Sequence, residues 1–486
     1  MILKHFLIVS LFFVQTLFYG QTNKAVTSYK NDLKIFKTIL EQGHPNLHQY
    51  IQKKQLDSLF NILLKDSDKS SQLGFLKNLY QFSDAIQDGH IEIYPPTNLV
   101  ANSYHFPLIL KIIQGKAYNY AEHTSIPSGS LIQSVNGIAM EQILMNLKKY
   151  IPSDGHLTQT KERGIEQKFD GLYTLEYGAT KNYEIEFIDS FKITKKIILP
   201  AVKQTDLSVW LNLLDPKPDP FVKNKVSPIK HNTDKIFFAY DAQKRTAFLK
   251  IESFAMGSQN FNKSLDQIFF QLKKDKIINL IIDIRQNKGG NRANTIRLMS
   301  YITTGFFKQR KRAHVGTLAI PAKEYAMGSY FEEELNLKEK FKNHPVYNGW
   351  TSNFDDLEPM MVPSKNRFTG GVYVLIDGST QNEASDFALL AKNDTNITLV
   401  GEETGCTFHT HNIGLRVFYE LPTSGIQFSF HMKNVQNFVK SQLPTNTRGV
   451  VPNRFIPFTI NDIISCKDSQ LLYVLKLVTG NNTTHY

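Results

Sequence analysis

Two apolar strands, each ending in a turn that leads into a helix, constrain the fold of this chain most strongly. The first strand ends at Arg285, and the second ends just before Asp377. Apolar strands that alternate with helices are typical of βαβ crossovers and therefore predict an α/β core. The expected elements are strands over 246–251, 277–284, 372–376 and 397–401, with helices over 259–273, 293–303 and 383–392.

The amino-terminal end is typical of a signal peptide. Lys4 precedes an apolar run over about 6–18, and the small Gly20 comes just before a polar stretch. The run is shorter than the roughly 18 to 20 apolar residues that a membrane-spanning helix needs. We therefore expect export with removal of residues 1–20. The product is then a periplasmic or extracellular protein without an integral membrane segment.

Periodicity divides the remaining chain into four regions. Apolar residues at helical spacing predict a helical amino-terminal region over 21–100. Residues 101–203 are strand-rich, and their Asn136-Gly137 turn before a helix over 140–147 is similar to the centre of a PDZ-like domain. A stretch with several prolines and no period predicts a linker over 204–245. The α/β core is then expected over 246–486.

Composition excludes several classes of protein. Hydrophobic residues make up 41% of the 486 residues, which is ordinary for a globular chain. The net charge of +12 comes from lysines scattered among acids, as in 273–276, so we expect a solvated basic surface and no nucleic-acid partner. Cys406 and Cys466 allow one bridge but no disulfide framework.

The turns that follow the two strands are the best candidates for chemistry. Gly289 and Gly290 let backbone N–H groups approach a ligand, and the following helix start favours an oxyanion or a carboxylate. Neither the dinucleotide-binding glycine pattern nor the P-loop pattern is present here. A side chain near Asn382, at the start of the second helix, should point to the same end of the sheet.

Six segments in order resemble the C-terminal processing (tail-specific) and tricorn-like serine peptidases. They are Asp88-Gly89-His90, 283–290, 380–386, 401–405, Leu421-Pro422 and 448–453. The resemblance implies a ClpP/crotonase-like βαβ core with a PDZ-like middle domain and a helical amino-terminal region. It also implies an exported hydrolase that cleaves polypeptides through a serine acyl-enzyme, without a cofactor.

The nucleophile segment departs from the family pattern. The family's serine position falls on Asn382, and Ser385 follows three residues later on the same helix face. We expect Ser385 to be the nucleophile, although it could be a helix-packing residue. Asn382 is expected to line the substrate site together with Gly289 and His409, although an Asn at a helix start also serves as an N-cap.

The remaining roles follow from the same resemblance. The processing peptidases use a lysine base that would fall in 405–409, but no lysine occurs there. The tricorn-like branch uses a histidine that His90 resembles, so His90 is expected to be the base, unless it only shapes its turn. Gly290 and Glu383 would supply the oxyanion N–H groups, although the carboxylate of Glu383 would repel an oxyanion. His409 and His411 share a strand face, but we expect no metal. The alternative function is a catalytically inactive member that binds polypeptide tails.

Overall fold

The computed structural model describes residues 28–100, 103–121, 123, 125–207, 235–343, 349–353, 360–440 and 447–480. The predicted signal peptide and most of the predicted linker lie outside these residues. Within the described ranges, no helix has both the length and the apolar character needed to cross a bilayer.

A six-stranded sheet forms the core in the order β10-β11-β12-β16-β17-β22. The strands from β11 to β22 are parallel, and β10 pairs antiparallel with β11 at one edge. The α/β class predicted from the strand and helix pattern is confirmed. The bounds are β10 Ile236–Asp241, β11 Thr246–Ile251, β12 Asn279–Asp283, β16 Gly371–Ile376, β17 Ile397–Gly401 and β22 Arg454–Phe455.

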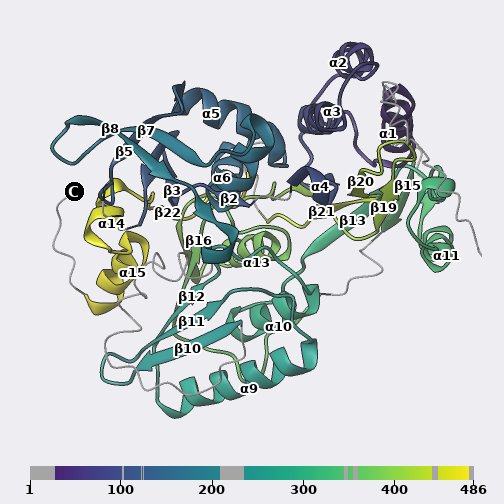
Figure 1. Ribbon diagram of the computed structural model, residues 1–486. Helices are drawn as coiled ribbons and strands as arrows, with labels where there is room; N and C mark the ends of the chain where they lie inside the picture. The colour runs from purple at the N-terminus through teal and green to yellow at the C-terminus, as the bar shows by residue number, and fades with distance from the viewer. Residues whose placement is uncertain are drawn as a thin grey trace, which may run out of the picture.

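Helices cover both faces of this sheet (Figure 1). Leu280 and Ile282 of β12 belong to the cluster that contains α9 (Ser258–Lys274), α10 (Arg292–Ile302) and α13 (Glu383–Lys392). Ile281, between them, packs with α15 (Ser469–Thr479) on the other face. This alternation explains why the strand reads as continuously apolar, since both of its faces are buried.

The middle region is a second sheet with two helices. Its strands are β3 Leu110–Ile113, β4 Lys116–Asn119, β5 Leu131–Val135, β6 Ile138–Ala139, β7 Asn182–Ile188 and β8 Thr194–Pro200. Alongside lie α5 (Met140–Leu147), the short helix η1 (Lys148–Tyr150) and α6 (Thr158–Tyr177). The sequence predicted α5 but missed α6. The glycines within α6 weaken its helical signal, and a Cβ at Gly164 would lie 2.5 Å from Ile151.

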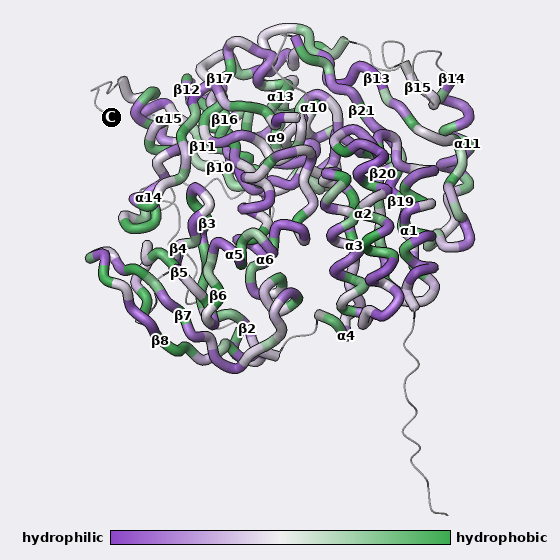
Figure 2. The backbone as a smooth tube through the Cα atoms, turned by 90° about the horizontal axis from the view of Figure 1, so that it is seen from above, coloured by the Kyte–Doolittle hydropathy of each residue, from purple (hydrophilic) through white to green (hydrophobic). Residues whose placement is uncertain are grey.

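The amino-terminal helices pack against a late segment of the chain. A cluster of buried apolar residues joins α1 (Lys30–Gly43), α2 (Lys53–Asp66) and α3 (Gln72–Ile86) to residues of β19 and β20. Figure 2 shows these helices beside the two strands, and α3 also contacts the middle region, since Tyr80 packs against Tyr150 with ring centroids 4.9 Å apart. The predicted helical region therefore shares a hydrophobic cluster with β19 and β20, which had been assigned to the α/β core.

Two further sheets complete this side of the molecule. One has the order β1-β20-β19 and the other β14-β15-β13-β21-β18. The bounds are β1 Glu92–Tyr94, β13 Arg310–Val315, β14 Lys342–Asn343, β15 Trp350–Asn353, β18 Thr410–Asn412, β19 Arg416–Glu420, β20 Gln427–His431 and β21 Lys433–Asn437. The other short elements are α4 Thr97–Val100, β2 Tyr104–His105, β9 Val202–Lys203, η2 Gln204–Asp206, η3 Lys323–Tyr325, α11 Phe331–Lys340 and α14 Ile460–Ser465.

The predicted linker extends too far at its carboxyl end. Residues 204–245 were assigned to it, but Ile236–Asp241 form β10, which pairs with β11 over six residue pairs. The prolines lie earlier, at 216–228, and the apolar residues that follow them are the edge strand of the core.

Candidate active site

His90 lies in the turn between α3 and β1. Gln87 ends α3 in the left-handed conformation, at φ 59°, and the chain then turns through Asp88 and Gly89 into the strand. The side chain of Asp88 accepts from the backbone N–H of His90 at 2.9 Å, which closes the turn. His90 is buried, with 7% of its surface exposed. The Asp-Gly-His segment therefore presents its imidazole in a fixed place.

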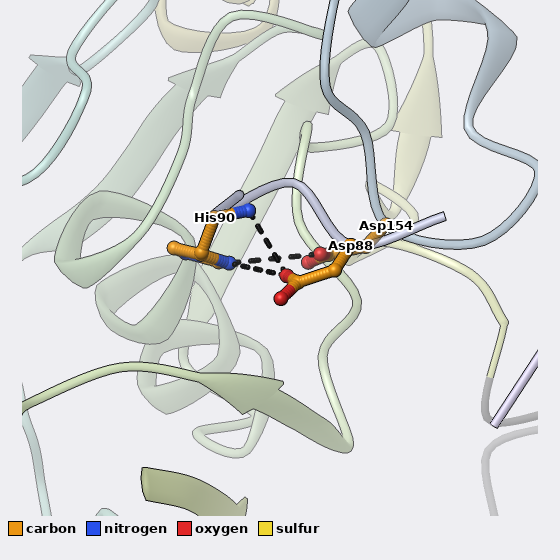
Figure 3. A group of neighbouring side chains, drawn as sticks. All are labelled: Asp88, His90 and Asp154. Atoms are coloured by element: carbon orange, nitrogen blue, oxygen red, sulfur yellow. Dashed lines mark hydrogen bonds and ion pairs between the residues drawn. The ribbon is translucent and has the colours of Figure 1, made fainter. Parts of the chain in front are cut away.

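Two buried carboxylates face the same edge of the His90 ring, as Figure 3 shows. Nδ1 of His90 lies 3.2 Å from Oδ1 of Asp88 and 3.7 Å from Oδ1 of Asp154. Asp154 also accepts from the backbone N–H of Gly89 at 2.8 Å. Asp88 comes from the same turn, whereas Asp154 comes from the middle region between η1 and α6.

Asn382 lies at the other edge of the ring, where the chain enters α13. Its Oδ1 is 2.7 Å from Nε2 of His90. Its backbone has φ 50° and ψ −128°, which a residue with a Cβ rarely adopts. It makes no side-chain capping bond to α13. The side chain is thus turned into the site, and the N-cap role considered for it is not seen.

The hydrogen bonds determine where the protons of His90 lie. Nδ2 of Asn382 donates to the carbonyl of Lys288 at 3.0 Å, so the amide oxygen is the atom that faces His90. An amide oxygen and an ionised carboxylate only accept hydrogen bonds. Both ring nitrogens of His90 therefore carry protons, and the side chain is an imidazolium.

Electrostatics support the same assignment. Burial lowers the pKa of His90, but the hydrogen bonds and charges of Asp154 and Asp88 outweigh burial and raise the pKa well above its usual range. Burial raises the pKa of Asp88, yet hydrogen bonds from His44 and His90 hold it well below its ordinary value. An imidazolium cannot accept a proton, so in this arrangement His90 would have to lose one before it could act as a general base.

Ser385 points elsewhere. Its Oγ lies 2.8 Å from Oγ1 of Thr404 and donates to the carbonyl of Cys406 at 3.4 Å. It is 2% exposed, and among the hydrogen bonds of the described residues none joins it to His90. The structure therefore brings His90 together with Asn382 and not with Ser385.

The expected oxyanion donor is already engaged. The backbone N–H of Gly290 donates to Oε2 of Glu383 at 3.1 Å. The position requires glycine, because its φ is 141° and a Cβ would lie 2.1 Å from the backbone nitrogen of Ala255. At Gly289, a Cβ would lie 2.7 Å from the same Glu383 oxygen. The two glycines and Glu383 therefore meet at one point, but the carboxylate of Glu383 occupies the donor.

His409 and His411, predicted to share a strand face, lie in different surroundings. His411 is 3% exposed and stacks on His90, with ring centroids 6.0 Å apart. His409, predicted to bind substrate, lines a cleft of about 1080 Å³ together with His314 and Gln436. Its Nε2 lies 3.3 Å from the side-chain nitrogen of Gln436.

Asp88, His90 and Asp154 are the group among the described residues whose ligand atoms are close enough to hold a metal ion. The oxygens of Asp88 already accept hydrogen bonds from four donors: the backbone and ring of His90, the ring of His44 and the amide of Asn412. A carboxylate with every lone pair engaged favours a hydrogen-bonded clamp over metal ligation. We assign no metal to it.

Two features of the site were not predicted from the sequence. In the sequence, Asp154 is recognisable only as part of an Asp-Gly turn, 64 residues from His90. No local pattern indicates that its carboxylate lies beside the His90 ring. The two cysteines, for which one bridge was allowed, are free thiols. Sγ of Cys406 instead accepts from the backbone N–H of Asn382 at 3.2 Å.

Comparisons with known proteins give a family match for one part of the chain and a fold. Residues 245–413 match the model of peptidase family S41. A structure of mature CPAF complexed with lactacystin has a TM-score of 0.64 at 14% identity, over 93% of this chain and 99% of that chain. The crystal structure of a CPAF mutant gives 0.65 at 15% identity, over 94% and 98%. At such identities the likeness shows the fold. No curated protein sequence matches the chain.

Proposed function

Because residues 245–413 match the model of peptidase family S41, we propose that the protein binds polypeptide chains at a peptidase-type site whose nucleophile position is held by Asn382. The family match and the shared fold support a peptidase-type function. The proposed departure from the family concerns the reacting group: the protein holds a polypeptide without forming an acyl-enzyme on serine.

The hydrogen bond between His90 and Asn382 carries this proposal. A serine at a strained turn before a helix would need a neutral imidazole to take its proton. Here the turn keeps the strained backbone, but its side chain is an amide, which is not a nucleophile, and the 2.7 Å contact requires a protonated Nε2. The contact supports a site that is assembled to hold a ligand and lacks the hydroxyl that would attack it.

The second candidate is the serine peptidase expected from the sequence, with Ser385 as nucleophile and His90 as base. One observation favours it. Ser385 donates to the carbonyl of Cys406, and the Sγ of Cys406 accepts from the backbone N–H of Asn382, so one residue links the hydroxyl to the site. Its use would require the start of α13 to rearrange and His90 to lose a proton.

The finer assignments of fold and location belong to the same proposal. We infer that the middle region is PDZ-like and that the core is of the ClpP/crotonase-like type. The support for this inference is the order in which the six motif segments occur along the chain. Export to the periplasm or the cell exterior rests on the amino-terminal sequence, which lies outside the described residues.

A fluorophosphonate probe, combined with a binding assay, separates the two candidates. The protein without residues 1–20 is incubated with the probe, and labelling is located by mass spectrometry beside the Ser385→Ala variant. Equilibrium dialysis against a pool of randomised decapeptides measures binding and cleavage. We expect retained peptides, no cleavage and no labelling in either protein. Labelling at Ser385 that the variant abolishes would establish the peptidase instead.

A further inference from the structure

We propose that Asp154 is a positioning residue through which the middle region keeps His90 charged and bonded to Asn382. The proposal rests on the proposed function, because it concerns how the polypeptide site is held together. It adds a residue that lies outside the recognised motifs and outside the matched segment 245–413.

Asp154 joins three separate parts of the chain. It is 3% exposed and lies in the segment that leads from η1 into α6. Its Oδ1 accepts from the backbone of Gly89 at 2.8 Å, and its Oδ2 accepts from the backbone of Thr407 at 3.3 Å. The neighbouring Gly155 donates to the carbonyl of Gln87 at 2.9 Å. The turn of His90 and the loop after β17 are thus both fixed to the middle region.

The approach of these segments is close enough to need glycine. A Cβ at Gly89 would lie 3.0 Å from Oδ1 of Asp154 and 3.3 Å from its backbone nitrogen. Gly155 has φ 51°, and a Cβ there would lie 3.2 Å from the ring of Tyr50. Little room remains for Asp154 to move while the segments stay docked.

The charge of Asp154 is needed because Asp88 serves several donors. Asp88 divides its two oxygens among His44, Asn412 and two groups of His90. A buried imidazolium is costly, and a second carboxylate within 4 Å favours the charged form. With Asp154 neutral, a single shared carboxylate would face the ring.

The other titratable groups that face His90 offer no substitute. The ring of His431 lies 5.5 Å from that of His90, and burial together with the His90 charge lowers its pKa to about 3, so it is neutral. His411 stacks on His90 and has its Nε2 directed at Asp386, 3.6 Å away. Neither imidazole brings a negative charge to the ring of His90.

The helix that follows Asp154 is attached to the loops around Asn382. Thr160 of α6 donates to the carbonyl of Gly405 at 3.1 Å. Gln167 of the same helix donates to Ser379 at 3.4 Å and accepts from Lys288 at 2.7 Å. Docking of α6 and placement of the Asp154 carboxylate therefore occur together. The middle region reaches the site both through the helix and through the charge.

Asp154→Asn tests this assignment, because it removes the charge and keeps the shape. The titration of His90 is followed by NMR in protein labelled with ¹⁵N and ¹³C at histidine, and the spectrum of a His90→Gln variant assigns the signal. We expect the midpoint for His90 to fall by at least about one pH unit. Between the two midpoints, the affinity for the randomised decapeptide pool should fall about tenfold. Asp206→Asn, at an exposed site just after the middle region, should change neither quantity.

The outcomes distinguish this proposal from the proposed function. A His90 midpoint that is the same in Asp154→Asn and in the unmodified protein overturns the role of Asp154, even if peptides bind. A lowered midpoint with no peptide binding by either protein rejects the proposed function and leaves the role of Asp154 standing. If Asp154→Asn does not fold, the double variant Thr160→Val, Gln167→Ala loosens α6 instead. An unchanged midpoint there overturns the proposal equally.

Discussion

Replacing Asn382 with alanine should destabilise the protein, and replacing it with glycine should destabilise it less. Both variants lose the bond to the imidazolium of His90 and the bond to the carbonyl of Lys288. A hydrogen bond to a charged group contributes about 1.5–3 kcal/mol and a neutral one about 0.5–1.5 kcal/mol. The alanine variant should therefore lose about 2–4 kcal/mol of unfolding free energy.

The glycine variant removes a second effect. At φ 50° and ψ −128° the backbone of residue 382 is strained for any residue with a Cβ, at a cost of about 1–3 kcal/mol. Glycine relieves that strain but gains about 0.5–1 kcal/mol of backbone entropy in the unfolded chain. The two terms leave the glycine variant about 1 kcal/mol more stable than the alanine variant.

Urea unfolding of the three proteins, followed by circular dichroism at one pH near neutrality, measures these differences. The expected order of stability is the unmodified protein, then Asn382→Gly, then Asn382→Ala. An alanine variant as stable as the unmodified protein would show that the contact with His90 contributes nothing. An alanine variant more stable than the glycine variant would refute the strained turn.

Three further predictions concern the surrounding structure. The raised pKa of His90 gives stability that is fully present below about pH 6.5 and is lost as the pH rises through the folded value, whereas the lowered pKa of Asp88 gives stability that is present above about pH 3.9 and is lost as the pH falls through its folded value. Urea midpoints measured from pH 4 to pH 10 should therefore decline at the alkaline end in the unmodified protein. They should decline less in His90→Gln. Gly290→Ala should abolish soluble expression or shift the thermal midpoint strongly, since its Cβ would overlap the backbone of Ala255, while Gly257→Ala, where the added Cβ meets nothing within 4 Å, should express normally. Arg285→Met should lower the free energy of unfolding in urea by about 3–5 kcal/mol, because the carboxylates of Asp283 and Asp468, at 2.6 and 2.7 Å, lose their shared cation. A loss below about 1 kcal/mol would contradict that assignment.

The core was predictable because its signal is local. The helix over 383–392 and the strand over 397–401 were placed on the residues where the structure has them, since both are short, strongly apolar and bounded by clear turns. The helix α6 was missed because its glycines weaken the helical signal, and the reason for Gly164, the close approach of Ile151, is not visible in the local sequence. Local sequence also gave no sign that β19 and β20 would leave the core and pack on the amino-terminal helices.

The site was predictable in part. The motif order placed His90, Gly290 and residue 382 at one point of the fold, and the structure brings them there. The choice between Asn382 and Ser385 was not decided by the sequence, because residues three apart share a helix face and their partners lie far along the chain. In the structure Ser385 hydrogen-bonds to Thr404, and His90 hydrogen-bonds to Asn382. Asp154 was not foreseen, since its carboxylate reaches His90 only through the docking of the middle region.

The charge state of His90 decides whether the imidazole donates to Asn382 or can act as a base. Nitrogen-resolved NMR of the unmodified protein at pH 7, with the His90 signal assigned from the His90→Gln variant, reports whether each ring nitrogen carries a proton. We predict protons on both nitrogens, with the Nε2 proton hydrogen-bonded and its signal shifted in Asn382→Ala. A neutral ring with Nε2 unprotonated would contradict the bond to Asn382 and return His90 to the role of a general base.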